Sequence, residues 1–212
     1  PSGPTTLRAE KLLVAAGRRP VSEGLGLERI GVATERGRIK VDSRMRTGVE
    51  GVYAVGDCAS RIMLAHVASR EGEVAAENIM GAPVVMDYKT VPSVVYTSPE
   101  AASAGLSEDE ARRSGLSVRV GRFPMSANGR SLIANQGDGM VKYVVDEKYG
   151  EIVGVHMVGP SASELVAQSC LALRLECTVD ELITTIHAHP TVSEALREAA
   201  AATRGAAVNL PA

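Results

Sequence analysis

The stretch GMVKYVVDEKYGEIVGVHMVG, residues 139–159, decides the fold class of the second half of this chain. Apolar and polar residues alternate with a period of two on both sides of the turn residues EKYG, as in two strands that bury one face. The segment SVRVGRF at 117–123 repeats this alternation, and PSVVYT at 92–97 is a further strand. We therefore predict an antiparallel sheet with one face toward the core and one toward solvent.

Three helix starts near these strands carry the capping-box pattern, in which Ser or Thr is followed three residues later by Glu. The pairs are Ser107 with Glu110, Ser161 with Glu164, and Thr178 with Glu181. A further helix is expected over residues 193–203, where SEALREAAAAT has helical spacing. Together with the sheet, these helices predict a compact α+β domain.

The pattern before residue 88 is different. KLLVAAG at 11–17 and GVYAVGD at 51–57 are short apolar runs that end at glycine, which is typical of strands buried on both faces of a parallel sheet. GRIKVD at 37–42 is a short alternating strand. MLAHVASREGEVAAENIMG at 63–81 has the spacing of a helix that ends at its last glycine. These segments predict a partial α/β piece, with a domain boundary near residue 88.

The composition excludes several classes of function. The net charge is −2 with no basic stripe, so phosphate neutralisation on nucleic acid has no support. No stretch approaches the roughly 20 apolar residues that span a bilayer. Three cysteines, an odd number without framework spacing, suit a reducing cytoplasm. The first residues, PSGPTTLRAE, show neither an initial methionine nor a signal peptide, so we expect a fragment of a longer protein.

Gly56 and Asp57 stand at the carboxyl end of a predicted buried strand, where ligands of α/β sheets bind. The carboxylate can accept hydrogen bonds from ribose or polyol hydroxyls, and the next helix would direct free N–H groups to the same place. An ordinary Gly-Asp turn is the alternative. The arginines of VAAGRRP, residues 14–20, could likewise meet phosphates or be simply solvated.

The segment HAHPTVSE, residues 187–194, holds a candidate acid–base pair. Pro190 disfavours the helical conformation at His189, so His189 should stand just before a helix whose first turn contains Glu194. A carboxylate there can reach back to the imidazole, fix its tautomer and favour its charged form. Alternatives are a histidine satisfied at a helix entrance, a simple first-turn charge, or a metal pair of His187 and His189, which would need a further ligand.

Three motifs together resemble the pyridine nucleotide-disulfide oxidoreductase family: LLVAAGRRP, GVYAVGDCASRIMLAHVASREG and HAHPTVSEALREAA. The resemblance covers nearly the whole chain and is strongest to the members that oxidise dihydrolipoamide. It implies that residues 1–20 end an NAD-binding domain, that 21–87 are the returning segment of an FAD-binding domain, and that 88–212 form a dimerisation domain.

The resemblance also implies roles for individual residues. His189 would be the base that takes a thiol proton from dihydrolipoamide, with Glu194 orienting it, and the pair would serve the partner subunit of a homodimer. Asp57 would bind FAD hydroxyls. The remaining cofactor contacts would be Met63, Leu64 and Ala65 at the flavin end and Ala16, Gly17 and Arg18 beside NAD. The expected protein partner is the lipoyl domain of a 2-oxoacid dehydrogenase or glycine cleavage complex.

One departure from the family's pattern is large. The family's early C-x-x-x-x-C pair and its two Gly-rich fingerprints for FAD and NAD are missing, and Cys58, Cys170 and Cys177 do not replace them. We therefore expect the isolated chain to be inactive. The alternatives are a reductase of another disulfide, such as glutathione, and a non-catalytic dimerisation module.

Overall fold

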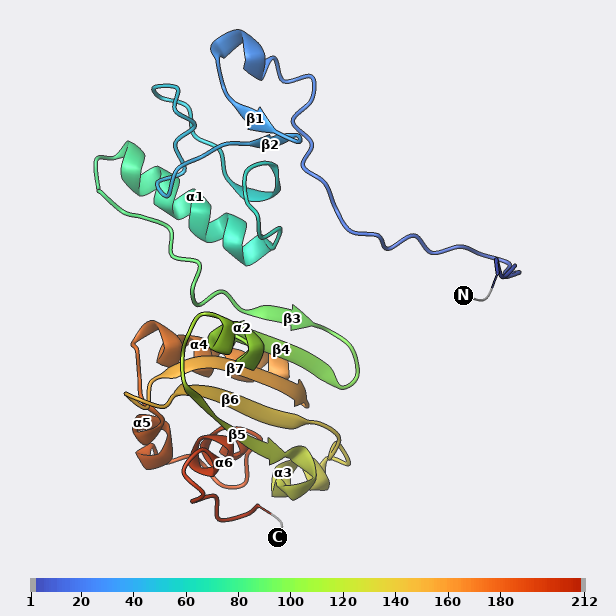
Figure 1. Cartoon of the computed structure of the whole chain (residues 1–212), viewed down its shortest axis with the longest axis vertical. Helices are drawn as coiled ribbons and strands as arrows, with labels where there is room; N and C mark the ends of the chain where they lie inside the picture. Colours follow the sequence, from blue (N-terminus) through green and yellow to red (C-terminus); the bar gives the residue numbers. More distant parts are fainter. Residues whose placement is uncertain (1–2, 211–212) are drawn as a thin grey trace. The chain divides into compact units, whose positions relative to one another are not determined.

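The computed structural model describes residues 3–210 and separates the chain into two compact units, residues 1–87 and 88–212. Each unit has its own arrangement of helices and strands (Figure 1). No helix among residues 3–210 is both long and apolar enough to cross a membrane.

The second unit is built on a five-stranded antiparallel sheet with the strand order β3-β4-β7-β6-β5 (Figure 1). The strands are β3 (Ser93–Val95), β4 (Glu100–Gly105), β5 (Val118–Pro124), β6 (Met140–Asp146) and β7 (Ile152–Gly159). The stretch 139–159 forms the central pair, in which Tyr143 is opposite Val155. The predicted antiparallel sheet is confirmed.

Helices cover this sheet unequally. They are α2 (Glu108–Arg113), α3 (Gly129–Ile133), α4 (Ala162–Arg174), α5 (Val179–Thr184) and α6 (Glu194–Ala202). The packing of α4 on β4 and β7, and of α6 on β5 and β6, encloses the main core, which includes Tyr143 and Leu196. Val144 points to the other face, where α2 covers one end through Ala111. That face is therefore wet only in part.

Tyr143 shows how tightly the main core is enclosed. Its hydroxyl forms a 2.9 Å hydrogen bond with the hydroxyl of Ser169 on α4, and both side chains are buried. Burial raises the pKa of Tyr143. The bond satisfies two polar groups in the apolar interior and ties the centre of the sheet to the middle of α4.

Two of the three predicted capping boxes are present, at Ser107 and Thr178. The third is wrong, because Ser161 adopts a left-handed conformation with φ of 58° and its side chain caps nothing. An N-cap side chain reaches the first N–H groups from an extended backbone. Instead, the carboxylate of Glu100 at the start of β4 accepts a 2.9 Å hydrogen bond from the backbone N–H of Ser163.

The first unit is smaller and less regular. It contains the short strands β1 (Thr34–Glu35) and β2 (Arg38–Ile39), the helix α1 (Ala65–Ile79), and 3-10 turns at Leu27–Ile30 and Gly56–Cys58. The predicted helix at 63–81 is confirmed as α1. Val32, Ile39 and Ala59 form a small core.

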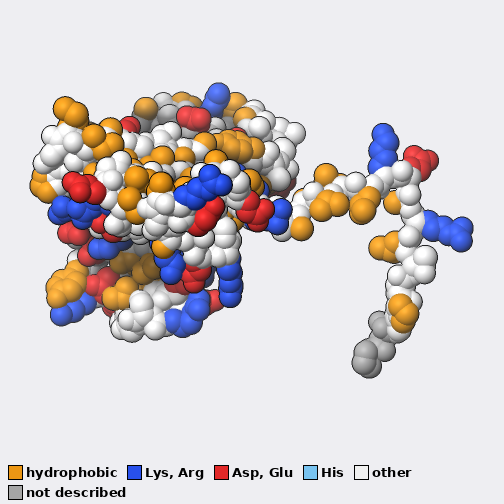
Figure 2. Space-filling model, turned by 90° about the horizontal axis from the view of Figure 1, so that it is seen from above, with side chains coloured by type: hydrophobic (Ala, Val, Ile, Leu, Met, Phe, Trp, Pro, Cys, Tyr) orange, Lys and Arg blue, Asp and Glu red, His pale blue; other side chains and the backbone are white. Residues whose placement is uncertain are grey.

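Two strands predicted in this unit are wrong. Residues 11–17 form no strand and are exposed, and residues 51–57 form only one bridge, at Tyr53, and part of a 3-10 turn. A strand buried on both faces needs neighbouring strands and covering helices. Among the described residues, no strand pairs with 11–17, and 51–57 has only the bridge of Tyr53 to Arg46. The apolar side chains of the N-terminal segment consequently remain uncovered (Figure 2), and Leu12 and Leu13 are almost fully exposed.

Candidate functional site

The first group of candidate residues lies in the second unit, on the segment that joins α5 to α6. We call residues 185–193 the connecting loop. Its His189–Pro190 peptide bond is cis, and α6 begins directly after it with Glu194. The carboxylate of Glu194 therefore stands at the start of a helix, where the helix dipole favours negative charge.

His189 and Glu194 are in direct contact. Nδ1 of His189 lies 2.9 Å from Oε1 of Glu194, and the other carboxylate oxygen accepts a 2.9 Å hydrogen bond from the backbone N–H of Thr191. Burial alone would raise the pKa of Glu194, but the hydrogen bonds from Thr191 and His189 lower it. The ionised carboxylate can only accept, so Nδ1–H of His189 donates this hydrogen bond, and in the neutral ring the Nε2 lone pair remains available.

The two side chains differ in exposure. The side chain of His189 is 79% exposed, whereas that of Glu194 is 28% exposed. The carboxylate is thus a partly enclosed support, and the imidazole is the part that can meet another molecule. This arrangement suits proton transfer at Nε2.

His187 lies in the same loop but does not join this pair. Its two ring nitrogens contact the carbonyl of Thr185 and the side chain of Gln168. Residues 3–210 contain no group of three or more His, Cys, Asp or Glu side chains that could hold a metal ion.

A supporting residue that the sequence did not reveal is Asn128. Its side chain is 4% exposed and donates a 3.0 Å hydrogen bond to the carbonyl of Thr191, 63 positions away, while its carbonyl oxygen accepts from the N–H of Ser131. No local pattern connects such distant positions, so only the fold shows that Asn128 holds one end of the connecting loop.

The second group of candidate residues lies in the first unit, around Asp57. Arg18 joins its members, because Nη1 lies 3.0 Å from Oδ2 of Asp57 and Nη2 donates to the carbonyl of Met63. Asp57 and the start of α1 are consequently within reach of one guanidinium group. Leu64 is the N-cap residue of α1 and Ala65 its first residue, and no side chain caps this end.

This geometry suits a polar, elongated ligand. The Asp57 side chain is 46% exposed and can accept hydrogen bonds from hydroxyls. The N–H of Ala65, the first residue of α1, forms no hydrogen bond within residues 3–210 and can donate to an oxygen or an electron-rich ring edge. Ala16 and Gly17 are exposed residues of the extended N-terminal segment beside Arg18.

Glu71 is a second support that the sequence analysis missed. Its side chain is buried, and it accepts a 2.7 Å hydrogen bond from the backbone N–H of Gly56, next to Asp57. The signal was present in the sequence, because Glu71 is a charged residue between Val67 and Val74 on the apolar stripe of α1. A carboxylate at such a position indicates a buried polar partner.

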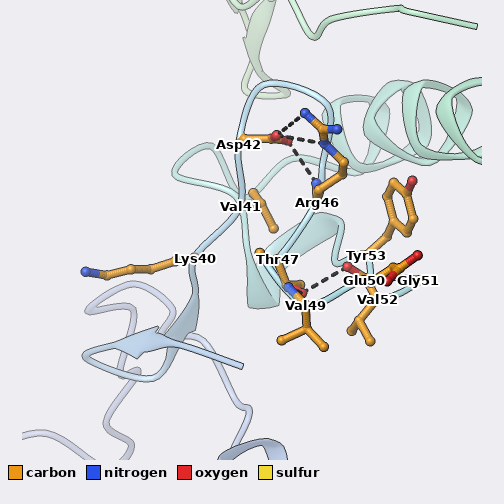
Figure 3. A pocket seen from close by; sticks show the side chains of 11 residues that line it. Lys40, Val41, Asp42, Arg46, Thr47, Val49, Glu50, Gly51, Val52 and Tyr53 are labelled. Carbon is orange, nitrogen blue, oxygen red and sulfur yellow. Dashed lines mark hydrogen bonds and ion pairs between the residues drawn. The ribbon is translucent and has the colours of Figure 1, made fainter. Parts of the chain in front are cut away.

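A cavity in the first unit is separate from these residues. It measures about 700 Å³ and is lined by residues 40–42 and 46–53 (Figure 3). Asp42 and Arg46 form its polar wall through an ion pair of 2.9 Å. Burial alone would raise the pKa of Asp42, but hydrogen bonds from Arg46 and Arg44 lower it. These contacts fix the loop itself, and no candidate residue lines the cavity.

Comparison with protein families gives two matches. The family described as "Pyridine nucleotide-disulphide oxidoreductase, dimerisation domain" matches residues 91–200, just over half of the chain. The family described as "Pyridine nucleotide-disulphide oxidoreductase" matches residues 2–72. The sheet and helices of the second unit therefore form the dimerisation domain of this family, preceded by part of a nucleotide-binding piece.

Curated relatives are similar along nearly the whole chain. Dihydrolipoyl dehydrogenase of Thermus scotoductus is 52% identical over 95% of the chain, and dihydrolipoyl dehydrogenase of Halobacterium salinarum is 48% identical over 97%. The chain spans only 44% of the length of each.

Solved structures show the same fold. LpdA from Mycobacterium tuberculosis has a TM-score of 0.81 at 33% identity, over 86% of this chain and 40% of its own. The HOCl-induced flavoprotein disulfide reductase RclA from Escherichia coli has a TM-score of 0.81 at 25% identity, over 88% of this chain and 44% of its own.

Proposed function

This chain belongs to the pyridine nucleotide-disulphide oxidoreductase family, and from that premise we propose that it is part of a dihydrolipoyl dehydrogenase, which oxidises dihydrolipoamide with NAD⁺. The observation that carries the proposal is the contact between His189 and Glu194. The names of the curated relatives support the same activity.

His189 is the acid–base residue in this proposal. Glu194 holds the proton on Nδ1, so the Nε2 lone pair takes the proton of a dihydrolipoamide thiol and returns it in the reverse direction. The carboxylate also stabilises the imidazolium that forms. The exposure of His189 supports an approach by a thiol from outside this subunit.

The first unit contributes the edge of the cofactor sites. FAD, when bound, supplies the two-electron acceptor between the dithiol and NAD⁺. Asp57 would bind hydroxyls of FAD. The N–H of Ala65, with Met63 and Leu64, would hold the flavin end. Ala16, Gly17 and Arg18 would contact NAD. The uncapped start of α1 next to Asp57 supports this fit.

The domain assignment follows the family. Residues 1–20 end the NAD-binding domain, residues 21–87 complete the FAD-binding domain, and residues 88–212 form the homodimer. His189 and Glu194 serve the redox centre of the partner subunit, and the lipoyl domain of a larger complex delivers the dihydrolipoamide. The isolated chain is inactive because it has neither a C-x-x-x-x-C pair nor a Gly-rich fingerprint.

The proposal is tested with His189→Gln in the full-length protein. We expect NAD⁺-dependent oxidation of dihydrolipoamide to fall by about 100-fold or more, the scale of general-base contributions. His156→Gln is the matched control, because His156 lies on β7 and bonds the carbonyl of Leu106. If His189→Gln retains nearly full activity while the control also does, His189 has no part in the mechanism.

A second candidate is reduction of a different disulfide, favoured by the structural similarity to RclA. Comparing the NADH-dependent reduction of lipoamide with that of glutathione disulfide by the full-length protein separates the two. A large preference for glutathione disulfide would replace dihydrolipoamide as the substrate and leave the family assignment unchanged.

A further inference from the structure

His187 is held from both sides of its ring. Nδ1 lies 3.0 Å from the carbonyl oxygen of Thr185, and Nε2 lies 3.2 Å from the side-chain amide nitrogen of Gln168 on α4. His187 is partly buried, as is Gln168. We call these three residues the His187 clasp.

The partners determine where the proton of this ring sits. A carbonyl oxygen only accepts, so Nδ1 of His187 must donate to Thr185. An amide nitrogen only donates, so Nε2 of His187 must accept from Gln168. Both nitrogens are thus occupied, and His187 has no free position for exchanging a proton with a substrate.

The clasp fixes the connecting loop at a distance. Gln168 is 19 positions away in the sequence, and α4 is anchored in the main core through Val166, Ala172 and Leu173. Position 187 is therefore held by an element that packs against β4 and β7. Loss of this contact would remove the hydrogen bond that joins position 187 to α4.

A second anchor lies on the other side of His189. Asn128 holds the carbonyl of Thr191, and the Thr191 hydroxyl donates a 2.7 Å hydrogen bond to the carbonyl of Ala188. The residues that carry and flank the candidate base, 188–190, therefore lie between two fixed points at 187 and 191.

His189 contrasts with His187 in both respects. Its Nδ1 meets Glu194, and within residues 3–210 no hydrogen bond reaches its Nε2. The two histidines have the same chemistry and stand two positions apart, yet one is fully bonded and the other presents a free nitrogen. The difference arises from their partners.

We propose that His187 and Gln168 are positioning residues, whose hydrogen bond holds the connecting loop so that Nε2 of His189 faces the incoming thiol. The inference rests on the proposed role of His189 as the base. It assigns the two imidazoles of the loop separate tasks, one structural and one chemical.

The first test reads the proton positions directly. Nitrogen-15 NMR of the chain at about pH 8, where an ordinary imidazole is neutral, should show His187 protonated on Nδ1 and bare on Nε2. In Gln168→Met, which keeps the side-chain length but removes the donor, this single tautomer should give way to a mixture. A proton on Nε2 of His187 in the unsubstituted chain would overturn the assignment, whatever the enzyme catalyses.

The second test measures the two half-reactions of the full-length enzyme separately. Gln168→Met should slow the reduction by dihydrolipoamide about tenfold, because loosening of a positioned base by a fraction of an ångström is costly. Reduction by NADH, which needs no thiol base, should keep its rate. Gln136→Met is the matched control, since Gln136 is the same residue type, is exposed and forms no side-chain hydrogen bond within residues 3–210.

Substitutions of His187 itself separate the effect of its hydrogen bonds from the effect of its size. His187→Phe fills the same space without nitrogens and should slow the thiol half-reaction, whereas His187→Gln offers an oxygen to Gln168 and should recover most of the rate. If Gln168→Met and His187→Phe both match the unsubstituted enzyme while His189→Gln is slow, the inference is wrong and the proposed function stands. If His189→Gln is also fast, the proposed function fails.

Discussion

At the scale of single residues, Glu194 performs two tasks with its two oxygens. One oxygen meets the imidazole of His189, and the other accepts the backbone N–H of Thr191. The same carboxylate that would orient the base also fixes the backbone of the connecting loop just before α6. A substitution at this position is therefore expected to change both the chemistry and the stability of the loop.

The lowered pKa of Glu194 makes this stability depend on pH. The folded protein favours the ionised carboxylate, so the contribution is present above the ordinary Glu pKa of about 4.3 and is lost as the pH falls through the lowered value. We expect Glu194→Gln to reduce the free energy of unfolding by about 1 kcal/mol near neutral pH, because the contact is partly open to solvent.

Urea unfolding at several pH values measures this difference, which should shrink toward zero in acid. Glu164→Gln is the control, because Glu164 also stands in the first turn of a helix and its carboxylate forms no hydrogen bond within residues 3–210. Equal losses in both variants would show that the helix dipole, and not the contacts of Glu194, is responsible.

At the scale of elements, the contact of β5 with α6 depends on Gly121. A Cβ atom at this position would lie 2.1 Å from the carbonyl oxygen of Ala199 and 2.7 Å from the backbone nitrogen of Thr203. These backbone atoms at the end of α6 leave no room for even one methyl group. The close approach at Gly121 therefore lets the backbone of α6 pack directly against β5.

Gly121→Ala should consequently destabilise the second unit by about 2–3 kcal/mol, the cost of overpacking a well-filled core. Thermal and urea unfolding measure this change. Gly129→Ala is the matched control: nothing lies within 4 Å of a Cβ there, and Gly129 is helical, so that variant should be neutral or slightly stabilised. Similar stability of the two variants would contradict the close packing.

The elements also show what the sequence can and cannot predict. Alternation at 139–159 and the boxes at Ser107 and Thr178 are local signals, and these predictions are confirmed. The box at Ser161 is wrong because a distant carboxylate takes its place. The prediction of a strand at 11–17 is wrong because a buried strand needs neighbouring strands, and the sequence of one segment does not show whether they are present.

The candidate sites follow the same rule. Five positions separate His189 from Glu194, and helix-start chemistry predicts that they can meet. The contacts of Gln168 with His187 and of Asn128 with Thr191 span 19 and 63 positions. They depend on how α4 and α3 are placed by the fold, so no pattern in one segment reveals them.

At the scale of the whole molecule, the two units differ in how complete they are. The second unit has a large core shared by its sheet and helices. The first unit has fewer buried apolar side chains, among them the cluster of Val32, Ile39 and Ala59, and it leaves an apolar segment exposed. The family match identifies the second unit as the dimerisation domain.

We therefore expect residues 88–212 to fold and dimerise alone, because one closed core suffices for a domain of this size. Sedimentation equilibrium of this segment should give twice the chain mass. The 212-residue chain should also be dimeric, without flavin absorbance after purification, whereas the full-length protein should be yellow. A monomeric segment 88–212 would contradict the expectation for the interface, and stoichiometric FAD in the 212-residue chain would contradict the expected absence of flavin.

The carboxylate of Glu100 couples the register of β4 and β7 to the N-terminal capping of α4. Glu100 is opposite Gly159 in the pairing of β4 with β7, and its side chain caps α4, which starts three positions after Gly159. A slip of the strands by one residue would turn this carboxylate to the other face and leave α4 uncapped. A one-residue register shift would therefore cost free energy in two ways, through the misplaced strand side chains and through the lost cap of α4. The second unit should consequently unfold as one cooperative body, without a populated state in which the sheet persists and α4 is detached.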